Sequence, residues 1–133
     1  MSQEFIQDLK NRAAALNRRD LGTALEGLPI DLEWHTAAEL PDAEVLHGTD
    51  ALRRYWERLL DEFEDYGTEP VEFIEADSET VIARFVTTAK GRRTGIEMRA
   101  EITHVWQLRD GIPWRITEYF DHTSALEAVG LSD

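Results

Sequence analysis

The chain contains no cysteine among its 133 residues. This absence excludes a disulfide framework, a thiolate nucleophile and any metal site built on cysteine. Apolar runs are also short, and none approaches the roughly 20 residues that a membrane-spanning helix requires. The first residues, MSQEFIQDLKNRAAAL, interleave acidic with apolar side chains, which is not typical of a signal peptide. We therefore expect a cytoplasmic protein.

Basic residues are scarce, with 14 Lys and Arg against 27 Asp and Glu and a formal net charge of −13. A strongly acidic surface repels a phosphate backbone. The one basic cluster, the KGRR sequence of residues 90–93, is interpreted as a solvated hairpin tip. Nucleic acid and membranes are therefore not expected partners. The four histidines lack metal-ligand spacing, so no metal is expected; they are His35, His47, His104 and His122.

The remaining composition is that of a folded protein, with 42% hydrophobic and 31% charged residues. The length predicts a single domain over residues 1–133. Apolar residues at helical spacing predict helices over residues 3–18, 21–28 and 52–63. Asp20 is expected to cap the second of these helices, and either Thr49 or Asp50 the third.

Alternating apolar residues predict strands over residues 31–36, 44–47, 68–75, 80–89, 95–109 and 112–121. A short terminal helix is expected over residues 123–128, stopped by Gly130. Helices precede strands in blocks, so the expected class is α+β. A long curved meander with three helices over its concave side would leave a cavity.

The Asp110-Gly111 pair predicts a tight hairpin, because both central residues of a type I′ turn need positive φ. A regular register from this turn puts His104 opposite Thr117 and Ile102 opposite Tyr119. One face then carries Met98, Ala100, Ile102, His104, Trp106, Arg115, Thr117, Tyr119 and Asp121. This mixture of apolar walls with a few polar groups is typical of a ligand pocket.

The opposite face of this hairpin is half apolar and half charged. Its apolar members are Val105, Trp114, Ile116 and Phe120. This composition favours a solvated surface or a subunit contact, and we expect a homodimer through this outer face. A slip of one residue would exchange the two faces. Across the preceding loop, Phe85 is expected to lie opposite Ala100.

Three stretches of this sequence resemble one family. They are GTDALRRYW from Gly48, HVWQLRDG from His104, and YFD at 119–121 followed by ALEA at 125–128. Over nearly the whole chain, the sequence resembles SnoaL-like proteins of the NTF2-like superfamily, which includes polyketide cyclases, ketosteroid isomerases and limonene epoxide hydrolases. The resemblance implies a cone of three N-terminal helices packed on a curved antiparallel sheet, with a short C-terminal helix.

The resemblance also implies a chemistry. SnoaL-type cyclases close a ring by an intramolecular aldol reaction without a cofactor, using a pocket Asp as general acid/base, and Asp121 is the matching position here. His104 would be its partner or an electrophilic donor, and Tyr119 would hold an apolar, polyketide- or steroid-like substrate. The alternatives are that Asp121 caps the terminal helix, that His104 is a satisfied buried residue, and that Tyr119 is core. The expected walls of the substrate site are Trp34, Trp56, Phe85 and Trp106.

Three other functions are open to a chain of this fold. A non-catalytic ligand-binding or dimeric assembly module would use the same pocket without turnover. Arg99-Ala100-Glu101 resembles the Arg-x-Asp pair of limonene epoxide hydrolases, but this register turns Arg99 and Glu101 away from Asp121. A ketosteroid isomerase needs a second acid in the cavity, which the sequence does not identify.

Overall fold

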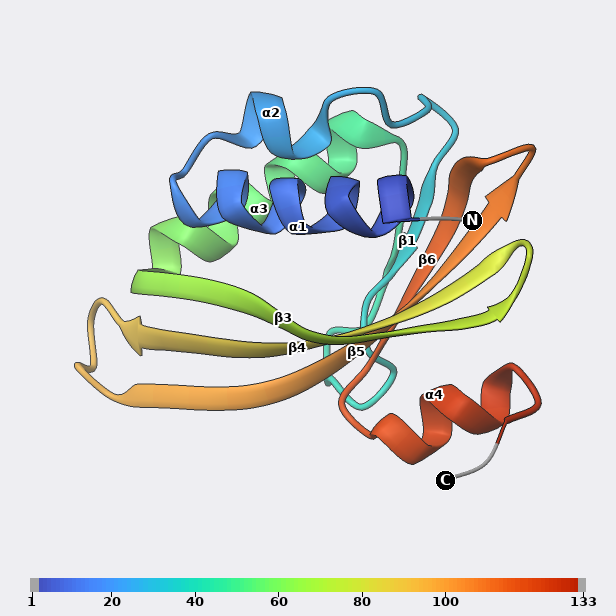
Figure 1. Cartoon of the computed structure of the whole chain (residues 1–133). Helices are drawn as coiled ribbons and strands as arrows, with labels where there is room; N and C mark the ends of the chain where they lie inside the picture. The colour runs from blue at the N-terminus through green and yellow to red at the C-terminus, as the bar shows by residue number, and fades with distance from the viewer. Residues whose placement is uncertain (1–2, 132–133) are drawn as a thin grey trace.

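The computed structural model describes residues 3–131 as four helices and one six-stranded sheet (Figure 1). Their order is α1 (Gln3–Asn17), α2 (Leu21–Leu25), β1 (Glu33–His35), β2 (Val45–His47), α3 (Thr49–Glu62), β3 (Phe63–Asp77), β4 (Thr80–Gly91), β5 (Glu97–Arg109), β6 (Ile112–Tyr119) and α4 (His122–Ala128). No helix in this part of the chain is long and apolar enough to cross a membrane. The expected α+β class is confirmed, with three N-terminal helices, a curved sheet and a short C-terminal helix.

The sheet has the strand order β2-β1-β6-β5-β4-β3 and is not closed into a barrel. Helices α1, α2 and α3 lie on one side of it, and α4 lies on the other (Figure 1). The sheet is antiparallel as expected except at one pair, where β1 runs parallel to β6. A parallel neighbour requires a long connection, and here the chain from α3 through β5 supplies it.

Asp20 caps α2 as expected, with its carboxylate accepting a hydrogen bond from the Thr23 backbone N–H at 3.2 Å. The cap of α3 differs from expectation, because it is Gly48 rather than Thr49 or Asp50. Gly48 has a φ of 87°, and a Cβ there would lie 2.8 Å from the carbonyl oxygen of Ile30. The close approach of these two backbones therefore requires glycine.

The basic turn after β4 has a structural role beyond solvation. Arg92 donates hydrogen bonds to the carbonyl oxygens of Leu60, Asp61 and Phe63, at 2.9–3.2 Å. These carbonyls lie where α3 ends and β3 begins. Carbonyls in the last turn of a helix lack partners within the helix, so a guanidinium there stabilises the end of α3.

The predicted turn between β5 and β6 is confirmed. Asp110 and Gly111 have φ values of 53° and 79°, and Arg109 pairs with Ile112.

Beyond the turn, the predicted register is wrong by one residue. Leu108 pairs with Pro113 as expected, but Gln107 pairs with Arg115, which leaves Trp114 as an extra residue on β6. Pro113 has no N–H to give to the ladder, and such positions are typical of β-bulges.

The bulge exchanges the two faces of β6. His104 lies opposite Glu118 rather than Thr117, and Tyr119 lies opposite Thr103 rather than Ile102. Ile116, Glu118 and Phe120 therefore belong to the concave side of the sheet. On the neighbouring pair, Phe85 lies opposite Ile102. That shift of two residues from the expected register leaves every side chain on its predicted face.

The exchange also changes the composition of the outer face that was expected to form a dimer. Ile116 is fully buried in the main core, and Phe120 lines the cavity. Val105 does lie on the convex side, but it packs with Ala125 and Leu126 of α4 in a second core. The four residues predicted for this surface do not form one.

The main core lies between the first three helices and the concave face of the sheet. Its members come from every element except β3 and α4, and Leu9, Leu52, Val81, Trp106 and Ile116 are among them. The predicted terminal helix is confirmed as α4. It ends before Gly130, which has a φ of 80°.

Candidate functional site

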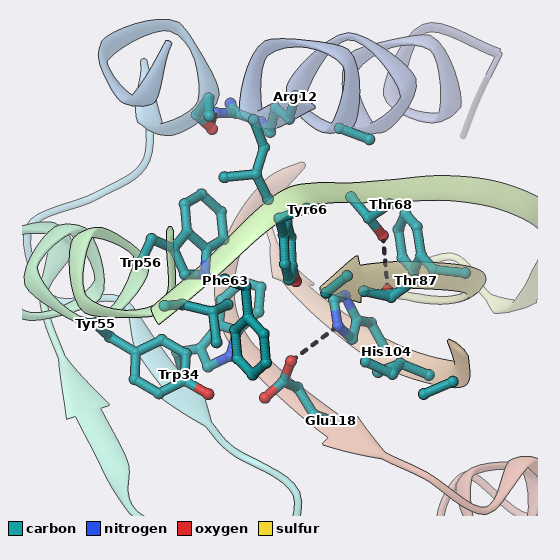
Figure 2. A pocket seen from close by; sticks show the side chains of 18 of the residues that line it. Arg12, Trp34, Tyr55, Trp56, Phe63, Tyr66, Thr68, Thr87, His104 and Glu118 are labelled. Carbon is teal, nitrogen blue, oxygen red and sulfur yellow. Dashed lines mark hydrogen bonds and ion pairs between the residues drawn. The ribbon is translucent and has the colours of Figure 1, made fainter. Parts of the chain in front are cut away.

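A cavity of about 270 Å³ lies between the helices and the concave face of the sheet (Figure 2). Its wall is mostly apolar and aromatic, with side chains from α1, α2, α3 and five of the six strands. The concave residues of β5 expected to face a pocket do so; they are Met98, Ala100, Ile102, His104 and Trp106.

A histidine–glutamate pair occupies one end of this cavity. His104 on β5 and Glu118 on β6 are direct cross-strand neighbours, and their Nε2 and Oε2 atoms lie 3.2 Å apart. Each side chain is only 14% exposed. An ionised Glu118 accepts from Nε2–H, which leaves Nδ1 as the unprotonated nitrogen of a neutral imidazole. Nδ1 is buried and has no hydrogen-bond partner.

Aromatic rings enclose the imidazole. The ring centroid of His104 lies 5.2 Å from that of Trp34 and 4.8 Å from that of Phe85. Trp34 in turn contacts Trp56 and Trp106 edge to face, at 5.6 Å and 6.0 Å. All four aromatic residues that the sequence suggested as walls of the substrate site line the cavity. They exclude water from the pair and fix the position of the imidazole.

Two tyrosines at the same end were not identified as site residues from the sequence. Burial raises the pKa of Tyr66 to about 12, and the charge of Glu118 adds to the effect. Burial and Glu118 also raise the pKa of Tyr55. Both phenols stay protonated at neutral pH, so their hydroxyls are available as hydrogen-bond donors beside the carboxylate.

The predicted register places Glu118 on the opposite, half-charged face of the hairpin. Tyr55 lies within the helix predicted over residues 52–63, and Tyr66 precedes the strand predicted over residues 68–75. No local sequence signal distinguishes these three residues, since their common position depends on the bulge in β6 and on the full length of β3.

Asp121 lies outside the cavity wall. Its Oδ1 accepts from the backbone N–H of Thr123 at 3.1 Å, and its Oδ2 accepts from the Ser124 hydroxyl at 2.8 Å. It is the N-cap of α4. Tyr119 packs in the core beneath α4. The structure therefore does not bring His104 together with Asp121 and Tyr119, because the bulge turns both to other surroundings.

Arg12 is the cation on the cavity wall within residues 3–131. Its Nε donates to Asp8 at 2.9 Å and its Nη1 donates to the Ala24 carbonyl at 2.9 Å. Asp8 neutralises this guanidinium, which ties α1 to α2. Over the same residues, no cluster of three or more potential metal ligands is present.

The residues that resemble an epoxide hydrolase pair lie on the other side of the sheet. Glu101 binds Arg84 at 2.6 Å, and Glu101 and Arg99 alternate with the cavity residues of β5. Their predicted orientation, away from the pocket, is confirmed.

The family model of the SnoaL-like domain matches residues 10–119. The chain belongs to the SnoaL-like domain family. A search of curated proteins gave no significant match.

Solved structures share the fold of this SnoaL-like domain at low sequence identity. An NTF2-like protein of unknown function from Burkholderia pseudomallei is 22% identical, with a TM-score of 0.76 over 98% of this chain and 99% of the other. TerC, co-crystallised with polyporic acid, is 21% identical, with a TM-score of 0.74 over 93% and 96%. A putative SnoaL-like polyketide cyclase from Mesorhizobium loti is 21% identical, with a TM-score of 0.68 over 90% and 99%.

Proposed function

We propose that this SnoaL-like domain binds an apolar small molecule in its cavity and transfers a proton on it, as a cyclase or isomerase that uses acid/base chemistry without a cofactor. The observation that carries the proposal is the His104–Glu118 pair. It is nearly buried, held at 3.2 Å, and faces the cavity. A carboxylate in a water-excluded site that is oriented by a neighbouring N–H has the geometry of a general base.

In this proposal Glu118 takes the role that the family resemblance implies for Asp121. One carboxylate oxygen accepts from His104 Nε2–H, and the other takes a proton from a ligand carbon beside a carbonyl group. The electron pair of the broken C–H bond moves onto the carbonyl oxygen. Hydroxyl donors from Tyr55 and Tyr66 would stabilise the negative charge there.

Ligand size follows from the volume of the cavity. An engineered protein cavity of about 150 Å³ holds one benzene molecule, so 270 Å³ suits a body of about one to two rings inside the wall. Met98 and Phe120 line the same cavity, and these two apolar residues remain 47% and 41% exposed to solvent. A polyketide- or steroid-like ligand would extend between these two side chains.

The proposal is tested by exchange of the ligand's acidic C–H for deuterium in D₂O, followed by NMR. A panel of polyketide, steroid and terpenoid ketones is first screened for thermal stabilisation. For ketones that bind, Glu118→Gln should slow exchange by about 10²-fold or more, the usual contribution of a general base. Asp121→Asn, which keeps its capping oxygen, is the matched control and should leave exchange unchanged.

The rival function is a carrier that binds without turnover, which the predominantly apolar wall favours. Ketones that stabilise the protein but exchange no faster than in buffer would support the carrier and contradict the acid/base proposal. Exchange that is lost in Asp121→Asn but kept in Glu118→Gln would return the catalytic role to Asp121.

We also propose that the domain forms a homodimer through the part of the convex face that α4 leaves uncovered. Sedimentation at micromolar concentration checks the dimer, and a monomer at that concentration would contradict it.

A cytoplasmic location stays a prediction, which cell fractionation would check.

A further inference from the structure

Glu118 is the one carboxylate on the cavity wall within the described residues 3–131. It is 14% exposed, and the hydrogen bond it makes is with His104. Nδ1 of His104 is buried and has no acceptor for a second proton, so the hydrogen-bond geometry favours an imidazole that carries its single proton on Nε2 and does not neutralise this carboxylate. The other charged group on the wall, Arg12, is already paired with Asp8. A buried charge without a counter-ion costs free energy, so a bound ligand that supplies a positive charge gains by pairing with it.

The surroundings of Glu118 also favour a cation. Its charge acts on the phenols of Tyr55 and Tyr66, and Trp34 packs against its partner His104. All three rings line the cavity, and Figure 2 shows them at the end where Glu118 lies. Faces of aromatic rings attract organic ammonium ions, and cages of such rings bind alkylated amines.

We propose that the ligand of this cavity is an organic ammonium ion, a protonated tertiary amine on an apolar ring body, with its nitrogen between Glu118 and the surrounding aromatic rings. This inference rests on the proposed function, because it names the ligand of the same site.

The degree of alkylation follows from the number of hydrogen-bond acceptors. A primary ammonium brings three N–H donors, each of which needs an acceptor when it is buried. The wall beside Glu118 is mainly aromatic and offers few. A tertiary ammonium brings one N–H, and its alkyl groups pack on the rings. The Oε2 atom of Glu118 that pairs with His104 has a second lone pair to accept this N–H, which leaves the other oxygen to act as the base. Long-range attraction by the net charge of −13 favours any cationic ligand over a neutral one at low salt.

The test compares two probes of the same shape by isothermal titration calorimetry at pH 7. N,N-dimethylbenzylamine is cationic at this pH, and isobutylbenzene is its neutral carbon counterpart. We expect the wild type to bind the amine at least about tenfold more tightly, which corresponds to about 1.4 kcal/mol. High salt screens the long-range attraction, so a preference that depends on Glu118 should persist there.

Glu118→Gln keeps the size of the side chain and removes its charge. It should reduce the preference to less than about threefold, while isobutylbenzene binds as before, which shows an intact cavity. Glu127→Gln is the matched control, because it removes one exposed negative charge from α4 on the other side of the sheet, and it should keep the full preference. If Glu118→Gln does not fold, the comparison of the two probes on the wild type still decides.

Equal binding of the two probes to the wild type would overturn the inference. So would an unchanged preference in Glu118→Gln, or an equal loss in Glu127→Gln. If a neutral ketone nevertheless binds and exchanges its C–H in a Glu118-dependent manner, the proposed function stands and only the ammonium ligand is wrong. Failure of both probes and of all ketones to bind would overturn both.

Discussion

The double contact of Asp121 with α4 leads to a prediction that separates capping from catalysis. Replacement by alanine removes acceptors for the Thr123 N–H and the Ser124 hydroxyl, which lie at 3.1 Å and 2.8 Å. Loss of a carboxylate cap costs about 1 kcal/mol, within a range of about 0.5–2 kcal/mol. In a domain of this size, about 1 kcal/mol lowers the melting temperature by about 3–6 °C. Asp121→Asn retains a capping oxygen and should lose at most about half as much.

The assay is thermal and urea unfolding of the wild type and both variants, together with ligand binding and C–H exchange. Asp121→Ala should lose stability and keep both functions once it is measured below its melting temperature. Equal stability of all three proteins would refute the capping energetics. A fully folded Asp121→Asn that has lost exchange would refute the assignment of the base to Glu118.

Three further predictions concern the fold and the tyrosines. Gly48→Ala should lower the free energy of unfolding by about 2 kcal/mol or more, because alanine is strained at this positive φ and its Cβ meets the Ile30 carbonyl. Chemical denaturation checks this, and an unchanged free energy of unfolding would contradict it. Arg92→Ala should cost about 1–2 kcal/mol by removing three hydrogen bonds at the end of α3, whereas Arg93→Ala should cost less than about 0.5 kcal/mol. Tyr66 should form phenolate near pH 12 rather than near pH 10. Because its pKa is raised in the folded state, the unfolded chain loses this proton first, so stability falls as pH rises from about 10 to about 12. Difference absorbance against Tyr66→Phe checks this, and a transition near pH 10 would contradict it.

The helices could be predicted because their apolar stripes are local features. α1 and α3 turn their stripes toward one sheet face and the cavity, and the Asp20 cap needs only residues of its own turn. The first part of β3 could not be predicted in the same way. It contains Gly67 and Pro70, and Asp65 has a φ of 56°. Pairing with β4 holds it as a strand, and this is a tertiary cause that overrides local propensity.

The pocket face of β5 could also be predicted, because strict alternation needs no partner. The site itself could not be predicted, because its position depends on which residues of β6 face the cavity. The turn at Asp110-Gly111 determines only the first pairs of the ladder. The extra residue Trp114 then turns each later side chain of β6 to the opposite face of the sheet from the one predicted. Pro113 is the visible signal of that irregularity, because proline in a paired strand is typical of a bulge or an edge.

The bulge links the site to the core. The guanidinium groups of Arg109 and Arg115 both lie against the ring of Trp114, with their central carbons 3.7 Å and 4.6 Å from its centroid. Residues after it alternate so that Ile116 is fully buried while Glu118 faces the cavity. A regular ladder would bury Arg115 and expose Ile116, and loss of that burial alone costs about 1.5–3 kcal/mol. Core packing therefore favours the register that places a carboxylate beside His104. Because one irregularity determines both, the position of Glu118 cannot be shifted along β6 without disrupting the core.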